Sequence, residues 1–187
     1  MVGMTGSGKT FLAEYILRYF KYVVVFDAKG LINWNGYELH RELEQLYRTK
    51  ADRIIYRPNI YELTDPDKIN DFFKFIYQRQ NTVCYIDEVF AVAPSWQETP
   101  FFYKAILTRG RELGITTISA TQRPAGIPSE ILSESEYGFW FKCKLPSDAE
   151  KVEKCTGIDR EYIQDLRKEY FYYTSLDETL GPLHYEE

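Results

Sequence analysis

The chain has 187 residues, 44% hydrophobic and 27% charged, which argues against a disordered protein and fits one folded domain over 1–187. Its net charge of −5 argues at first against nucleic-acid binding, but the acidic excess falls within 161–187, so residues 1–160 are neutral overall. No apolar run approaches a membrane span, and the three widely spaced cysteines argue against a disulfide framework or zinc site. We therefore expect a reducing, cytoplasmic setting.

The first motif is a phosphate-binding loop that matches G-x-x-x-x-G-K-[ST] at every fixed position, in the run Gly3-Met4-Thr5-Gly6-Ser7-Gly8-Lys9-Thr10. Glycines let backbone amides approach phosphate oxygens, and the helix that follows adds free N–H groups and a positive dipole end. We expect Lys9 to reach the β- and γ-phosphates of ATP, Thr10 to ligate Mg²⁺, and Phe11 to adjoin the nucleotide. The alternative is a glycine-rich turn with a chance Lys-Thr pair.

A strand should precede such a loop, and most of it is missing. Only Met1 and Val2 stand before Gly3. The first strand is therefore expected to be truncated or unusually short, and what supports the loop from behind is a question for the structure.

The first half of the chain alternates helical and strand patterns. Helical spacing predicts a helix over 9–20, and the apolar run 22–26 is typical of a buried parallel strand. A second helix is predicted over 38–49 and a short strand over 53–56. The Asp-Pro pair that opens the next segment predicts a helix through residue 78, with Asp65 as its cap.

The second half continues the alternation. A strand over 82–86 is followed by a loop at 91–100, a helix over 101–112 and a strand over 115–120. The remaining predicted elements are a short helix near 128–134, a strand at 137–143, a helix at 147–155 and a final strand near 169–174. The alternation predicts an α/β fold, with a mostly parallel central sheet flanked by helices and a small β-containing C-terminal extension over 137–187. Ligands of such sheets bind at the carboxyl ends of the strands.

Two adjacent acids follow the predicted strand over 82–86. Asp87 is positioned to hold Mg²⁺, and Glu88 to orient and activate an attacking water. Small-molecule kinases need no group that activates water, so Glu88 favours hydrolysis over phosphate transfer. An ordinary turn is the alternative, which the phosphate loop upstream makes less attractive.

Three further polar residues flank the strand over 115–120. Gln122, at its end, is a candidate sensor of the γ-phosphate or the lytic water, with a capped strand end as the alternative. Arg109 and Arg111, before it, are candidates for an arginine supplied to a neighbouring subunit's site, with a surface ion pair as the alternative.

The order of these motifs resembles the FtsK/HerA superfamily of DNA-translocating ATPases over roughly residues 1–145. The resemblance lies in Gly3–Thr10, Val83–Glu88, Gly110-Arg111-Glu112-Leu113-Gly114-Ile115 and Ala120-Thr121-Gln122-Arg123-Pro124. It implies a RecA/ASCE-type P-loop NTPase fold, with Arg111 as the finger that acts in trans and Gln122 as the sensor. It also implies a homo-oligomeric ring, a hexamer or pentamer, that moves double-stranded DNA without reading its sequence.

A bare ATPase core of this size most resembles the genome-packaging ATPases of membrane-containing icosahedral viruses, which implies a capsid or portal vertex as a partner. Candidate DNA-contacting parts are the loops 29–37 and 91–102, with Trp34 and Trp96, and a basic cluster; a packed or solvated surface is the alternative for each. The cluster consists of Lys142, Lys144, Lys151 and Lys154.

Three other classes stay open. The Ser119-Ala120-Thr121 segment also resembles the coupling segment of large terminases, although no nuclease domain fits within 187 residues. A small-molecule phosphotransferase would need an acceptor substrate. A nucleotide switch or assembly protein would bind ATP with negligible turnover.

Overall fold

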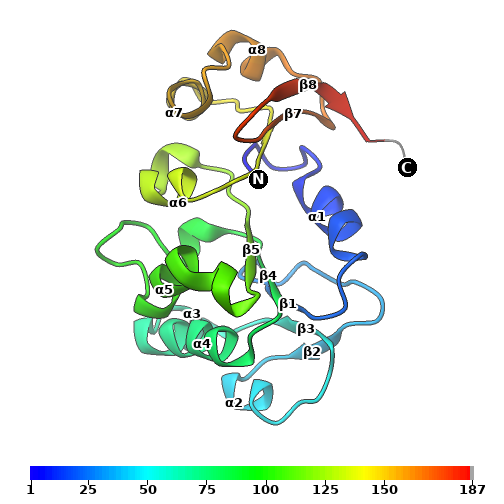
Figure 1. The fold of residues 1–187 in the computed structure, drawn as a ribbon, viewed down its shortest axis with the longest axis vertical. Coiled ribbons are helices and arrows are strands. Elements are labelled where there is room, and N and C mark those ends of the chain that lie inside the picture. Colours follow the sequence, from blue (N-terminus) through cyan, green and yellow to red (C-terminus); the bar gives the residue numbers. More distant parts are fainter. Residues whose placement is uncertain (186–187) are drawn as a thin grey trace.

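Short strands, two of which are apolar and fully buried, build the central sheet of the computed structural model, which describes residues 1–185. The strands are parallel, in the order β2-β3-β1-β4-β5. Their bounds are β1 (Val23–Phe26), β2 (Glu38–His40), β3 (Arg53–Tyr56), β4 (Val83–Ile86) and β5 (Thr116–Ser119). Figure 1 shows this sheet edge-on between helices, as the alternating pattern predicts.

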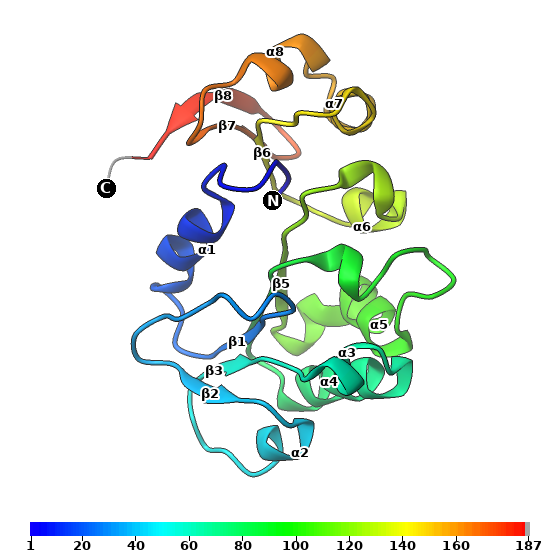
Figure 2. The same cartoon turned by 180° about the vertical axis from the view of Figure 1, so that it is seen from behind.

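Alternate side chains of each strand enter separate cores on the two faces of the sheet. Val24 and Phe26 of β1 pack against α4 (Pro66–Arg79) and α5 (Phe101–Arg109). Val23 and Val25 point the other way, toward α1 (Lys9–Leu17). Figures 1 and 2 show α1 on the face opposite α4 and α5, so the predicted covering of both faces is confirmed.

A small antiparallel sheet forms the C-terminal extension. It contains β6 (Gly138–Phe141), β7 (Tyr170–Thr174) and β8 (Thr179–His184) in that order, with α7 (Pro146–Thr156) and α8 (Arg160–Asp165) packed beside it. The extension matches the predicted β-containing C-terminal part. Glu186 and Glu187, the end of the acidic segment, lie outside the described residues.

Val2 joins the two sheets. It bridges in parallel to Thr121 beyond β5 and to Trp140 in β6. Its N–H donates to the carbonyl of Phe139 at 2.8 Å, and its carbonyl accepts from the N–H of Phe141 at 2.8 Å. The predicted first strand is therefore reduced to the two bridges of Val2, and the phosphate loop follows directly after this residue, between β6 and the segment beyond β5.

The helix predicted over 38–49 is wrong. Residues 38–40 form the edge strand β2, and only α2 (Leu43–Leu46) is helical. The apolar residues that suggested this helix do not share one buried face. Leu43 and Leu46 are buried, whereas Leu39 is 43% and Tyr47 51% exposed. Pairing of β2 with β3 satisfies backbone hydrogen-bonding groups of residues 38–40, so this segment forms a strand although it has no apolar face.

The remaining predicted helices and strands agree with the structure to within a few residues, and several short elements carried no usable signal. These are α3 (Ile60–Leu63), α8, β8 and the 3₁₀ turns η1 (Val89–Ala91), η2 (Gly110–Leu113) and η3 (Pro124–Gly126); the predicted helix near 128–134 is α6 (Ser129–Ser133). The strand at 170–174 is not the last one, because β8 follows it. The residues of β8 are exposed and include Gly181 and Pro182, which disfavour a strand prediction. Among residues 1–185, no helix has the length and apolarity needed to cross a bilayer.

The loop after β1 is built around the buried carboxylate of Asp27. Its Oδ1 accepts hydrogen bonds from the N–H groups of Gly30 and Leu31 at 2.9 and 3.1 Å. Its Oδ2 accepts from the N–H of Ile32 at 3.1 Å and from Nε of Arg57 at 2.9 Å. This network fixes the loop from 27 to 32 against β3.

We expect Asp27→Ala to lower the free energy of unfolding by about 3–5 kcal/mol, because it leaves the largely buried Arg57 and three loop amides without their acceptor. Denaturant titration measures the change. The control is Asp52→Ala, which removes a half-exposed pair with Lys21 at 3.8 Å and should cost less than about 1 kcal/mol. Equal losses in the two variants would contradict this role for Asp27.

Candidate active site

Glycines shape the phosphate loop, as the motif predicts. Gly3 has φ +151°, and a Cβ there would lie 2.5 Å from Cβ of Phe141, so only glycine fits against β6. Gly8, at φ +102°, is the residue from which α1 begins. The loop therefore ends at a helix N-terminus, the arrangement that favours phosphate binding.

The Lys9 side chain is buried and folds back over this loop. Its ammonium donates to the carbonyls of Gly3 and Met4 at 2.6 and 2.9 Å. Burial, followed by the nearby charge of Lys29, lowers the pKa of Lys9 to about 8, against the opposing effect of Glu88 and Asp87. An anion bound in the loop would stabilise the charged form of Lys9.

Thr10 and Asp87, 77 residues apart, meet beside the loop. The Thr10 hydroxyl donates to Oδ1 of Asp87 at 3.3 Å, and the Tyr85 hydroxyl donates to the same oxygen at 3.1 Å. Tyr85 was missed from sequence, although it lies two residues before Asp87 in the chain and so projects on the same side of β4.

Glu88 and Gln122 also meet, at the ends of β4 and β5. Oε1 of Glu88 accepts from the Thr121 hydroxyl at 2.8 Å and from the N–H of Gln122 at 3.4 Å. The Gln122 side chain in turn accepts a hydrogen bond from the Thr5 hydroxyl in the phosphate loop. Gln122 therefore connects Glu88 to the loop.

Lys29 is a member of this site that the sequence analysis did not assign to it. Its ammonium lies 3.6 Å from Oδ2 of Asp87 and 3.1 Å from Oε2 of Glu88. The signal existed, since Lys29 follows β1 at its carboxyl end, but it required knowing that β1 and β4 are neighbours. The side chain of Lys29 thus faces Asp87 and Glu88. The sequence predicted Lys29 only as part of the candidate DNA-contacting loop 29–37.

The oxygen ligands at this position fit Mg²⁺. Mg²⁺ is usually held by one or two carboxylates together with substrate phosphates and water, and the Thr10 hydroxyl and Asp87 supply hard oxygen donors beside the loop. Across residues 1–185 there is no cluster of three or more His, Cys, Asp or Glu side chains that could hold a metal alone. An ion here would therefore depend on phosphate and water ligands.

A cavity of about 360 Å³ opens above the loop. Phosphate-loop residues, Phe11, Lys29, Asp87 and Gln122 line one side of it. The other side is contributed by the C-terminal extension, through Lys168, Glu169 and Tyr185. No sequence motif predicted that residues of the extension lie beside the nucleotide.

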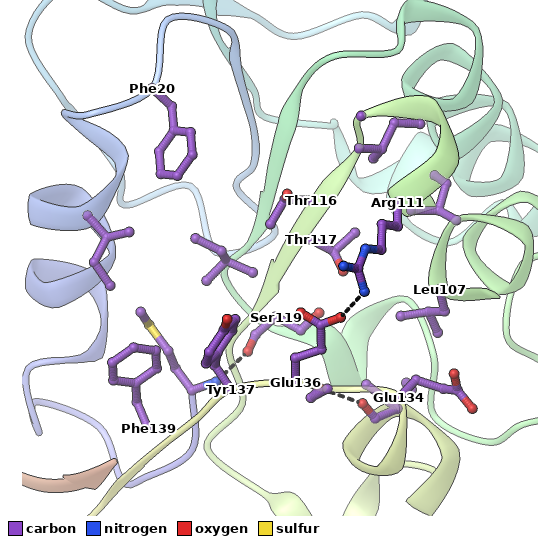
Figure 3. A pocket seen from close by; sticks show the side chains of 18 of the residues that line it. Phe20, Leu107, Arg111, Thr116, Thr117, Ser119, Glu134, Glu136, Tyr137 and Phe139 are labelled. Atoms are coloured by element: carbon purple, nitrogen blue, oxygen red, sulfur yellow. Dashed lines mark hydrogen bonds and ion pairs between the residues drawn. The ribbon is translucent and has the colours of Figure 1, made fainter. Parts of the chain in front are cut away.

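Arg111 lies in a different place from these residues. It belongs to η2 and lines a cavity of about 720 Å³ along β5, where Nη1 is 3.3 Å from Oε1 of Glu136 (Figure 3). Its side chain is 92% exposed. Arg109, at the end of α5, is also exposed. Neither arginine lines the cavity above its own phosphate loop.

Comparison with known proteins agrees with this geometry. Residues 1–143 match the family model described as "ATPase family associated with various cellular activities (AAA)". A comparison with curated protein sequences gave no match.

Two solved viral structures share the fold over nearly the whole chain. The genome packaging NTPase B204 from Sulfolobus turreted icosahedral virus 2, in complex with AMPPCP, is 16% identical with a TM-score of 0.79, covering 97% of this chain and 95% of that one. B204, the DNA-packaging ATPase from Sulfolobus Turreted Icosahedral Virus, is 18% identical with a TM-score of 0.73, covering 98% and 96%. At this identity the likeness establishes the α/β P-loop NTPase fold, with its parallel sheet and its small C-terminal sheet.

Proposed function

The chain belongs to the ATPase family associated with various cellular activities (AAA), and from that premise we propose that it is a Mg²⁺-dependent ATPase that packages viral double-stranded DNA. The observation that carries the ATPase proposal is the meeting of the Lys9 loop, the Thr10–Asp87 pair and Glu88 at one edge of the sheet. The packaging proposal is supported by the fold shared with B204 over nearly the whole chain, including the C-terminal sheet.

In this mechanism the loop amides and Lys9 would hold the phosphates of ATP, and Thr10 and Asp87 would hold Mg²⁺. The ion would neutralise charge that develops on the transferring phosphate. Glu88 orients the attacking water and accepts its proton. The Thr121 hydroxyl and the Gln122 N–H fix the carboxylate that performs this step.

Lys29 restrains Glu88 before nucleotide binds. Its ammonium pairs with Oε2, the carboxylate oxygen that Thr121 and Gln122 do not contact. Binding of the triphosphate introduces a competing anion, so Lys29 can turn toward phosphate and release that oxygen. Gln122, linked to Thr5, is placed to report the γ-phosphate to β5.

We assign the chain to the FtsK/HerA-type motors as a further part of this proposal, on the R-x-x-G-I and A-T-Q-R-P motifs. Such a motor forms a homo-oligomeric ring, a hexamer or pentamer, and binds DNA phosphates independently of the DNA sequence. Its partners would be double-stranded DNA and a capsid or portal vertex, and its setting the cytoplasm of the host.

An ATPase assay with and without double-stranded DNA tests the proposal. We expect Mg²⁺-dependent turnover that rises several-fold when DNA is added, because a motor couples hydrolysis to its track. Turnover that DNA leaves unchanged in assembled protein would contradict the motor. ATP binding with negligible turnover would favour a nucleotide switch, and turnover that requires a small acceptor would favour a phosphotransferase.

A further inference from the structure

The C-terminal hairpin of β7 and β8 returns to the phosphate loop, although it lies outside residues 1–143 that match the family model. Figures 1 and 2 both show the end of β8 next to the start of α1. At one point of contact, Lys168 approaches Gly6: a Cβ on Gly6 would lie 3.9 Å from Cε of Lys168. At the other point, Tyr185 reaches Gly8 and Phe11.

Tyr185 lies directly over the helix N-terminus of the loop. A Cβ on Gly8 would collide with its phenol oxygen and ring. Its ring stacks on Phe11, with centroids 4.8 Å apart and an interplanar angle of 23°. It also stacks on the preceding residue, His184, with ring centroids 5.8 Å apart and an interplanar angle of 5°. The mouth of the loop is therefore edged by aromatic rings from both ends of the chain.

A nucleotide whose phosphates fill the loop must place its sugar and base outside it, beyond the first turn of α1. Phe11 is in that turn and Tyr185 is in contact with it. Flat aromatic rings stack on any base, and such stacking contributes substantially to binding. The chemistry of this mouth thus suits a purine or pyrimidine base better than an open chain of phosphates.

We propose that Tyr185 stacks on the base of the bound nucleotide. The C-terminal hairpin then completes a nucleotide site whose phosphate-binding half lies in the part of the chain that matches the family model. This inference rests on the proposed nucleotide binding. At 4.8 Å the rings of Phe11 and Tyr185 leave no space for a base between them, so binding separates the pair. Tyr185 follows the last residue of β8, and its ring can turn without breaking the β7–β8 pairing.

Calorimetric titration with two probes tests the stacking. AMPPCP has both a base and a triphosphate, whereas inorganic tripolyphosphate has only the phosphates. With Mg²⁺ present, we expect Tyr185→Ala to weaken AMPPCP binding about tenfold and to leave tripolyphosphate binding unchanged. Tyr185→Phe should retain the affinity for AMPPCP, since it keeps the ring. Lys9→Ala should lose both ligands.

The control is Tyr162→Ala, which removes a 63%-exposed tyrosine of α8 in the same extension and should change neither affinity. Equal AMPPCP affinities in Tyr185→Ala and wild type would overturn the inference. So would tighter binding of both probes, since the ring would then be a plug over the loop. Wild-type protein that binds neither probe would overturn the proposed function itself, and the inference with it.

Discussion

Glu88→Gln is expected to keep ATP binding and to lower turnover by at least about a hundredfold, the usual contribution of a general base. The amide oxygen can still accept from the Thr121 hydroxyl, so the side chain should stay in place. It cannot take the proton of the attacking water. Removal of one carboxylate beside Lys29 leaves Asp87 as that ammonium's remaining partner, which should not weaken nucleotide binding.

Phosphate release under saturating ATP, together with AMPPCP affinity, measures these two effects separately. Asp87→Asn is the informative contrast, because it alters the proposed Mg²⁺ ligand and should affect Mg²⁺-dependent binding as well as turnover. Glu130→Gln, an exposed acid on α6, controls for the loss of a negative charge. Near-wild-type turnover in Glu88→Gln would remove Glu88 from its role.

The predictable part of the site is the part encoded by adjacent residues. Lys9 and Thr10 follow from one motif, and Asp87 and Glu88 from two acids after an apolar strand. Their meeting then follows from the rule that ligands bind at the carboxyl ends of parallel strands. The structure brings Thr10 to Asp87 and Glu88 to Gln122 as this rule requires.

Lys29 and Tyr185 could not be found in this way, because each reaches the site through a contact that depends on the three-dimensional arrangement. Lys29 faces the acids because β1 lies beside β4, and sequence does not fix the order of strands. Tyr185 depends on a hairpin whose second strand, β8, is exposed and lacks apolar alternation. The sequence signal is weakest where pairing of backbone groups, rather than burial, determines the structure.

The same distinction explains the support of the phosphate loop. Met1 and Val2 alone predict no stable strand, and a two-residue segment has no periodicity to interpret. In the structure, Val2 is held by the backbone of Phe139 and Phe141 on one side, while Gly3 donates to Thr121 at 3.1 Å on the other. These long-range backbone hydrogen bonds give the phosphate loop a rigid base on both sides.

Arg111→Ala is expected to lower turnover by about a thousandfold or more in assembled rings, the lower range of what an arginine finger contributes. The Arg111 side chain is exposed and lies away from the cavity above its own loop, as a group that acts on a neighbour must. Its ion pair with Glu136 is exposed, so its loss should barely affect stability. Arg109→Ala is the matched control; a larger loss there would make Arg109 the finger.

Mixing two inactive variants tests whether the site is shared. Arg111→Ala subunits keep an intact Lys9 loop, and Lys9→Ala subunits keep an intact Arg111. In randomly mixed rings at equal amounts, about a quarter of the interfaces pair an intact loop with an intact arginine, because each interface joins different faces of two neighbours. Turnover should therefore recover to a comparable fraction of wild type. Mixed rings that assemble but never recover turnover would show that Arg111 does not complete a neighbour's site.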